Sequence, residues 1–249
     1  MDPRVVRELL ERVRGSDVSV EEALETLRQL PFRDIGIATV DHHRALRQGM
    51  PEVIFGERKT VDQIARITEE MVRAGSNVLV TRVDPEKAAA LQLRLPAFRH
   101  AVEARTLSIE VAPVPPRARG PVAVVTAGTS DMDVAEEAVE TLKAVGLEPV
   151  RYYDIGVAGI HRLLHRLDDL RKAAAVIVVA GMEGALPSVV GGIVSAPIVA
   201  VPTSVGYGTA LGGFTALFAM LTSCASGVVV VNIDSGFGAA MAVHRILKD

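Results

Sequence analysis

The chain has 249 residues, enough for one or two domains, and its 49% hydrophobic content excludes a disordered protein. A formal net charge of -3 gives no electrostatic basis for binding nucleic acid or a membrane surface. Its single cysteine excludes an intramolecular disulfide, and neither a signal peptide nor an apolar run of membrane-spanning length is recognisable, so we expect a cytoplasmic protein.

Charged segments with helical spacing dominate the first part of the chain. Ser19 and Glu22 form a capping-box pattern, Thr60 and Asp62 open another helix, and Asp84 precedes a proline at a further helix start. We therefore predict a smaller N-terminal α+β domain, residues 1–116, that begins with a helical hairpin. Its expected helices are 4–13, 19–30, 60–74 and one from 84, and its expected strands lie near 52–55, 78–81 and 102–111.

A proline-rich linker, residues 113–121, is followed by strands that alternate with helices. This pattern predicts an α/β domain, residues 117–249, with a doubly wound parallel sheet of about five strands, flavodoxin- or Rossmann-like. Expected strands are 122–126, 149–153, 175–180, 198–201 and 228–233; expected helices are 133–145, 159–172, 184–194, 212–221 and 237–247.

Ligands of such folds bind beyond the carboxyl ends of the strands. That rule selects five loops, at residues 127–131, 154–161, 181–186, 202–210 and 234–238. In the first loop, free backbone N–H groups and the hydroxyls of Thr129 and Ser130, next to Gly128, favour a bound phosphate. An ordinary helix cap by Ser130 or Asp131 explains the same residues equally well.

The third loop places Glu183 directly after an apolar strand, beside Gly181 and Met182. A carboxylate in a partly dry cleft can act as an acid or base, although Glu183 could also simply favour the next helix start through the helix dipole. In the fourth loop, Thr203 and Gly206 are candidate substrate contacts.

The second loop delivers His161 and Arg162 as candidate substrate-binding residues, against the alternative of a solvated helix start. His165 follows His161 at helical spacing, but no acidic or cysteine ligand completes a metal set. In the N-terminal domain Asp41, His43 and Arg44, followed by Arg47, could grip phosphates or form a solvated turn.

Cys224 lies among small residues, next to Ser223, between a helix and an apolar strand. A lone cysteine is most often a small buried hydrophobe. The alternating pattern, however, leads us to expect Cys224 near the binding edge of the sheet, where a ligand could reach its thiol.

The C-terminal half resembles the family of aminoimidazole ribonucleotide carboxylases and N5-carboxyaminoimidazole ribonucleotide mutases. The matching segments are Gly128-Thr129-Ser130-Asp131, His161-Arg162, Ala180-Gly181 and Leu186-Pro187. Those purine-pathway enzymes carry a histidine before the Leu-Pro pair, where this chain has Ala185, and a proline-glycine loop where it has residues 221–227. They also lack an N-terminal domain of this size.

Over its whole length the chain is similar to the LarB family, the carboxylases of nickel-pincer cofactor biosynthesis that serve lactate racemase maturation. The resemblance is carried by Asp41-His42-His43-Arg44, the Glu183 loop, Cys224 and the segments at 52–56, 126–131 and 156–162. It implies carboxylation of nicotinic acid adenine dinucleotide by CO2 or bicarbonate, with hydrolysis to pyridinium-3,5-biscarboxylic acid mononucleotide and AMP. It implies no tightly bound cofactor, and purine-type enzymes are octamers, so we expect a homo-oligomer.

On this resemblance the thiolate of Cys224 adds to the pyridinium ring, which makes C5 nucleophilic toward CO2, and Glu183 or Asp131 removes the C5 proton. A free thiol has a pKa of about 8.5, and a helix C-terminus disfavours its anion, so we expect the cationic ring to help activate it. Mg2+ in the hydrolysis step is an open option, with Asp131 as the nearest candidate ligand. Two alternatives remain: a purine-pathway carboxylase or mutase, and a non-catalytic nucleotide-binding regulator.

Overall fold

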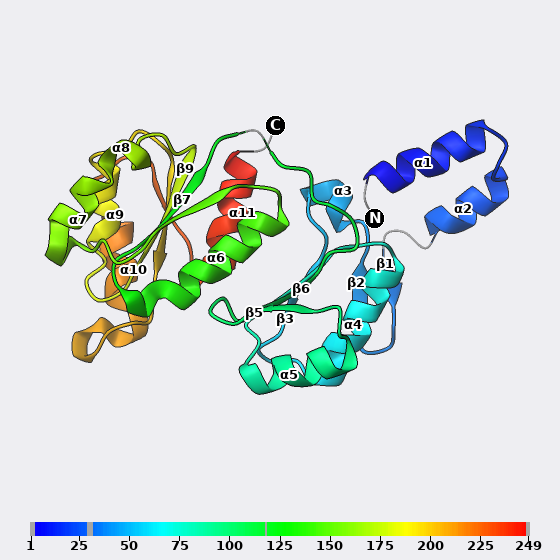
Figure 1. Ribbon diagram of the computed structural model, residues 1–249, viewed down its shortest axis with the longest axis horizontal. Coiled ribbons are helices and arrows are strands. Elements are labelled where there is room, and N and C mark those ends of the chain that lie inside the picture. Colours follow the sequence, from blue (N-terminus) through cyan, green and yellow to red (C-terminus); the bar gives the residue numbers. More distant parts are fainter. Residues whose placement is uncertain (1–2, 29–31, 118, 248–249) are drawn as a thin grey trace. The chain divides into compact units, whose positions relative to one another are not determined.

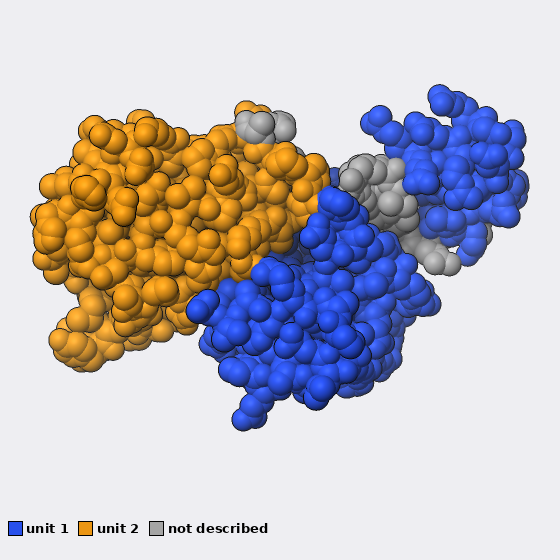
Figure 2. Space-filling view, in the orientation of Figure 1, with its two compact units in different colours: residues 1–113 blue, residues 114–249 orange. Residues whose placement is uncertain are grey.

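The computed structural model describes residues 3–28, 32–117 and 119–247 (Figure 1). The chain divides into two compact units, Met1–Pro113 and Val114–Asp249 (Figure 2). The sequence placed the domain boundary between residues 116 and 117. Each unit has its own hydrophobic core.

The first unit begins with the expected helical hairpin, α1 (Pro3–Arg14) and α2 (Val20–Arg28). The capping box is confirmed, because the Glu22 N–H donates to Ser19 Oγ and the Ser19 N–H donates to the Glu22 carboxylate. The expected helix end at Leu30 lies outside the described residues. A two-stranded antiparallel sheet follows, β1 (Phe32–Asp34) and β2 (Thr39–Asp41).

A four-stranded sheet forms the centre of this unit, in the order β3 (Val53–Phe55), β4 (Val78–Thr81), β6 (Thr106–Ile109) and β5 (Arg99–Ala101). Its helices are α3 (Arg44–Gln48), α4 (Val61–Arg73) and α5 (Pro85–Arg94). Thr60 and Asp84 cap α4 and α5 as expected. The strand expected at 102–111 is confirmed only in part, as β6: residues 102–105 form a turn, with Arg105 at φ 50°, that joins β6 to β5 as an antiparallel pair.

The second unit holds a five-stranded, wholly parallel sheet in the order β11-β10-β9-β7-β8, which confirms the doubly wound α/β prediction. Its strands are β7 (Val122–Thr126), β8 (Pro149–Tyr152), β9 (Ala175–Ala180), β10 (Ile198–Pro202) and β11 (Val228–Val230). β7, β9 and β10 are buried along their whole length. Their continuous apolar sequences follow from this, because helices cover both faces of the sheet.

Two helices, α6 (Met132–Ala144) and α11 (Gly236–Ile246), pack together on one face (Figure 1). At this crossing Gly236 is required, since a Cβ there would lie 2.1 Å from the Val134 carbonyl oxygen. The other face carries four helices: α7 (Ile160–His165), α8 (Leu167–Leu170), α9 (Leu186–Gly191) and α10 (Phe214–Leu221) (Figure 1).

Four elements in this unit differ from the sequence-based expectation by more than one residue at an end. The helix expected at 159–172 is broken at Arg166 into α7 and α8. α9 begins and ends inside the range 184–194, and α10 begins at Phe214 because Leu211, Gly212 and Gly213 have positive φ. The last strand ends at Val230 instead of residue 233.

The strand order creates a topological switch point. The chain passes from β7 to β8 on one side, and then returns to place β9 on the other side of β7. The loops that follow β7 and β9 therefore diverge to opposite faces and leave a crevice between them, which is where open α/β sheets bind ligands.

Candidate active site

A pocket of about 440 Å³ opens at this switch point, and all of its lining residues belong to the second unit. The loops after β7, β8, β9 and β10 contribute to it, four of the five loops that the strand-end rule selected. Its wall is mostly aliphatic. The polar side chains along it are Ser130, Asp131, Arg162, Glu183 and Tyr207.

Asp131 forms the buried floor of the pocket, with 3% of its surface exposed. Its Oδ1 accepts from Thr203 Oγ1 at 2.7 Å, and its Oδ2 accepts from the Gly128 N–H at 2.9 Å. Burial raises the pKa of Asp131, and the hydrogen bonds from Thr203 and Gly128 oppose this effect. Both carboxylate oxygens thus accept hydrogen bonds, one from within the loop after β7 and one from the loop after β10.

The loop after β9 presents Glu183, whose side chain is exposed and lines the pocket. Met182, just before it, has a left-handed backbone at φ 51°, which non-glycine residues rarely adopt. Gly181 is required, because a Cβ there would lie 2.4 Å from the Val205 carbonyl oxygen. The Met182 N–H donates to that same oxygen at 2.9 Å, so the Glu183 loop is fixed against the loop after β10.

Arg162 reaches the pocket from α7 and pairs with Asp154, with 2.5 Å between Nη1 and Oδ2. Asp154 also has a positive φ, and its N–H donates to Thr126 Oγ1. His161 is exposed and does not line the pocket, and the same holds for Thr129. Of the two residues predicted after β8, Arg162 therefore lies at the pocket and His161 does not.

Cys224 is exposed and is not among the pocket residues. It follows α10 and precedes β11, whose first residue, Val228, pairs with Ile198 at the start of β10. Its loop therefore enters the sheet at the amino ends of the strands, and the expectation that Cys224 lies at the binding edge was wrong for a single chain. Its neighbour Ser223 shares a 2.7 Å hydrogen bond with Ser188 of α9.

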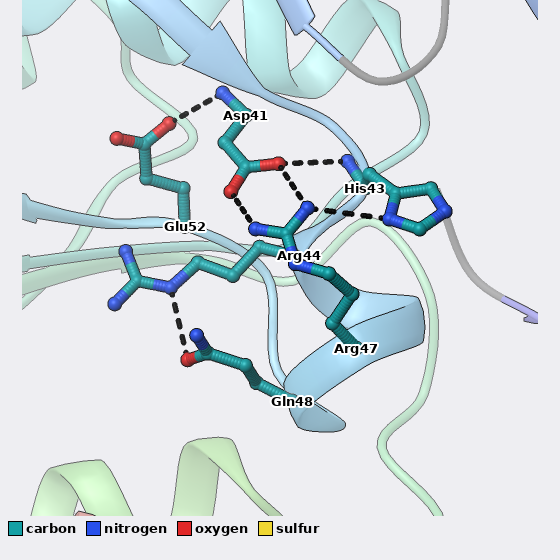
Figure 3. Close-up of polar contacts among 6 residues, drawn as sticks. All are labelled: Asp41, His43, Arg44, Arg47, Gln48 and Glu52. Carbon is teal, nitrogen blue, oxygen red and sulfur yellow. Dashed lines mark hydrogen bonds and ion pairs between the residues drawn. The ribbon is translucent and has the colours of Figure 1, made fainter.

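The predicted residues of the first unit form a separate polar cluster (Figure 3). Asp41 accepts from both terminal nitrogens of Arg47 and from the His43 N–H. Burial alone would raise the pKa of Asp41, but the Arg47 guanidinium, the His43 N–H and the charge of Arg44 together lower that pKa. Arg44 donates to Gln48. Much of the cluster's charge is thus satisfied internally, as expected for a structural turn.

Sequence reasoning missed two side chains of the pocket region. Asp154 orients Arg162, and Tyr207 stands at the pocket beside Gly206. The glycines on either side of Tyr207 were the available signal, because they mark a loop whose backbone needs unusual angles.

The described residues contain no group of three or more histidine, cysteine, aspartate or glutamate side chains placed to hold a metal ion. Asp131, the predicted metal ligand, accepts one hydrogen bond at each of its carboxylate oxygens. No helix in the described ranges is long and apolar enough to cross a membrane.

Two family models match this chain, one in each of its two compact units. Residues 32–111 match the model of the LarB/PurE-like N-terminal domain, and residues 121–249 match that of AIR carboxylase. Uncharacterized protein MJ0165 of Methanocaldococcus jannaschii is 37% identical over 98% of this chain and 97% of its own length.

The N5-carboxyaminoimidazole ribonucleotide mutase of the same organism is 31% identical over 51% of this chain and 78% of its own length. The crystal structure of Treponema denticola PurE is 23% identical, with a TM-score of 0.43, over 51% of this chain and 78% of that one.

Proposed function

This chain belongs to the AIR carboxylase family and has the LarB-type architecture, and on that premise we propose that it carboxylates the pyridinium ring of nicotinic acid adenine dinucleotide. The carboxyl group enters at C5, and hydrolysis of the phosphoanhydride then gives pyridinium-3,5-biscarboxylic acid mononucleotide and AMP. The observation that carries the proposal is the LarB-type pairing of domains on a chain whose carboxylase pocket holds Glu183 and lacks a histidine at Ala185.

Glu183 is the better candidate for the base. Its carboxylate is exposed at the pocket, whereas Asp131 is buried with both oxygens occupied. A base must come within hydrogen-bond reach of the proton that it removes, so Asp131 is assigned to positioning the loops. Ser130 and Arg162 border the same pocket, and a hydroxyl and a guanidinium are groups suited to hold a phosphate of the substrate.

The ring chemistry requires a reversible nucleophile. The Cys224 thiolate adds to C4, which consumes the ring cation and leaves an enamine across C5 and C6. C5 then forms a bond to CO2, Glu183 takes the C5 proton, and expulsion of the thiolate from C4 restores the pyridinium ring. Water cleaves the phosphoanhydride separately.

Because Cys224 lies outside the pocket of its own chain, we propose that a second copy supplies it. The thiol follows an apolar stripe on α10, where Phe214, Phe218 and Leu221 are 49%, 59% and 61% exposed. An exposed apolar patch of this kind is typical of a protein interface. A homo-oligomer would cover the stripe and bring Cys224 toward a neighbouring pocket.

The test is incubation of the purified protein with nicotinic acid adenine dinucleotide and isotopically labelled bicarbonate, with products identified by mass. We expect AMP and a labelled biscarboxylic acid mononucleotide. Unchanged dinucleotide, with and without added Mg2+, would refute the proposal.

The similarity to a ribonucleotide mutase supports a second candidate, a purine-pathway carboxylase or mutase. A parallel incubation with aminoimidazole ribonucleotide or its N5-carboxylated form decides between the two, because only a purine-type enzyme converts either compound. If the protein binds dinucleotide without changing any of these compounds, it is a nucleotide-binding regulator.

A further inference from the structure

Tyr207 is an aromatic side chain held at the mouth of the pocket without a packing role of its own. It lines the pocket, yet 82% of its surface is exposed. The other two tyrosines, both within the described residues, are partly buried in or next to β8. A large exposed aromatic ring on a binding pocket is a candidate for ligand contact.

The backbone on both sides of Tyr207 is fixed. The Val205 carbonyl accepts from the Met182 N–H at 2.9 Å, and the Tyr207 carbonyl accepts from the Ala210 N–H at 3.0 Å. Gly206 has φ +149°, and a Cβ there would lie 2.6 Å from Ala210 Cβ, so this turn requires glycine. A constrained turn that leaves one ring facing solvent positions that ring before any ligand arrives.

The surroundings indicate which ligand group the ring meets. The pocket contains the carboxylates of Asp131 and Glu183, and its cation, Arg162, is already paired with Asp154. Such a site suits an electron-poor or cationic ring, and the face of a tyrosine attracts a cation within about 6 Å of its centroid.

We propose that Tyr207 is a specificity-determining residue that covers the cationic pyridinium ring of the substrate by a cation–π contact. The inference rests on the proposed function and extends it, because it explains how the site would prefer a charged pyridinium to a neutral ring. It also places Tyr207 on the ring itself, and not on the adenine of the dinucleotide.

The experiment compares binding to the wild-type protein, Tyr207→Phe and Tyr207→Leu by isothermal titration calorimetry, with nicotinic acid mononucleotide and AMP as separate probes. We expect Tyr207→Leu to weaken the binding of nicotinic acid mononucleotide by about 3- to 30-fold and to leave that of AMP unchanged. Tyr207→Phe keeps the aromatic face and should bind the mononucleotide as the wild type does.

Equal binding of the mononucleotide by wild type and Tyr207→Leu would overturn the inference, as would a loss confined to AMP. If the wild type binds no pyridinium nucleotide, the proposed function itself fails, and this result differs from either of the others. Thermal unfolding of all three proteins checks folding, which a substitution at so exposed a side chain should leave unchanged.

Discussion

Thr203 donates its side-chain hydroxyl to Oδ1 of Asp131 at 2.7 Å, across 72 positions of sequence, and both groups are buried. The bond joins the loop after β10 to the loop after β7 at the floor of the pocket. Since Gly128 occupies the other oxygen of Asp131, the carboxylate is a structural centre of the site.

Thr203→Val should destabilise the protein. The substitution leaves Oδ1 of a buried carboxylate without its donor, which costs about 1.5–3 kcal/mol in the free energy of unfolding. It should also raise the pKa of Asp131 further, because the Thr203 hydrogen bond opposes the effect of burial. Urea unfolding measures the first effect, with Thr203→Ser, which keeps the hydroxyl, as the matched control. If Thr203→Val and Thr203→Ser had equal free energies of unfolding, the hydrogen bond from Thr203 to Asp131 would contribute nothing to stability.

The burial of Asp131 should make stability depend on pH. Its pKa is raised in the folded state, so the folded protein holds the proton more tightly than the unfolded chain does. Wild-type stability, relative to Asp131→Asn, should therefore fall as the pH rises above about 4, and level off above the raised pKa. Unfolding free energies of both proteins between pH 3 and pH 8, about the range where carboxylates titrate, test this. If the wild type instead gained stability relative to Asp131→Asn as the pH rose, the prediction would be wrong.

Cys224→Ser should abolish carboxylation of the dinucleotide, because a serine hydroxyl is a poor reversible nucleophile for the ring. The fold should be unaffected, since the side chain is exposed. Product formation is followed by mass, and dinucleotide affinity by calorimetry serves as the control. Full turnover by the serine protein would exclude covalent catalysis by Cys224.

Glu183→Gln should stop the reaction at a later stage. The thiolate can still add to C4, but the amide cannot take the C5 proton, so a covalent adduct should accumulate on the peptide that contains Cys224. Mass analysis of digested protein after incubation with dinucleotide detects it. Met182→Leu, a volume-conserving change in the same loop, controls for disturbance of the loop. If Glu183→Gln turned over normally, Glu183 would not be the base that removes the C5 proton.

Two inactive proteins should restore activity when their chains are mixed. If each site takes Cys224 from one copy and Glu183 from another, refolding Cys224→Ala with Glu183→Gln creates some sites with both native residues. About a quarter of wild-type activity is expected from random pairing in a symmetric oligomer. A mixture that stays inactive, although size-exclusion chromatography shows mixed oligomers, would place both residues in one chain.

Much of this protein is determined by its sequence alone. The apolar runs of β7, β9 and β10 predicted a doubly wound parallel sheet, and the strand-end rule then selected the loops that carry Asp131 and Glu183 and the loop that ends just before Arg162. These inferences succeed because periodicity and burial act over a few neighbouring residues. The helix caps at Ser19, Thr60 and Asp84 were predictable for the same reason.

Only the tertiary structure showed how the surroundings of these residues differ. Asp131 and Glu183 looked alike as candidate bases, and burial and hydrogen bonding from distant loops separated them. Cys224 stands next to an apolar strand in the sequence, yet the parallel pairing of β10 with β11 puts its loop at the opposite edge from the pocket. Such relationships depend on contacts between residues far apart along the chain, which no local pattern encodes.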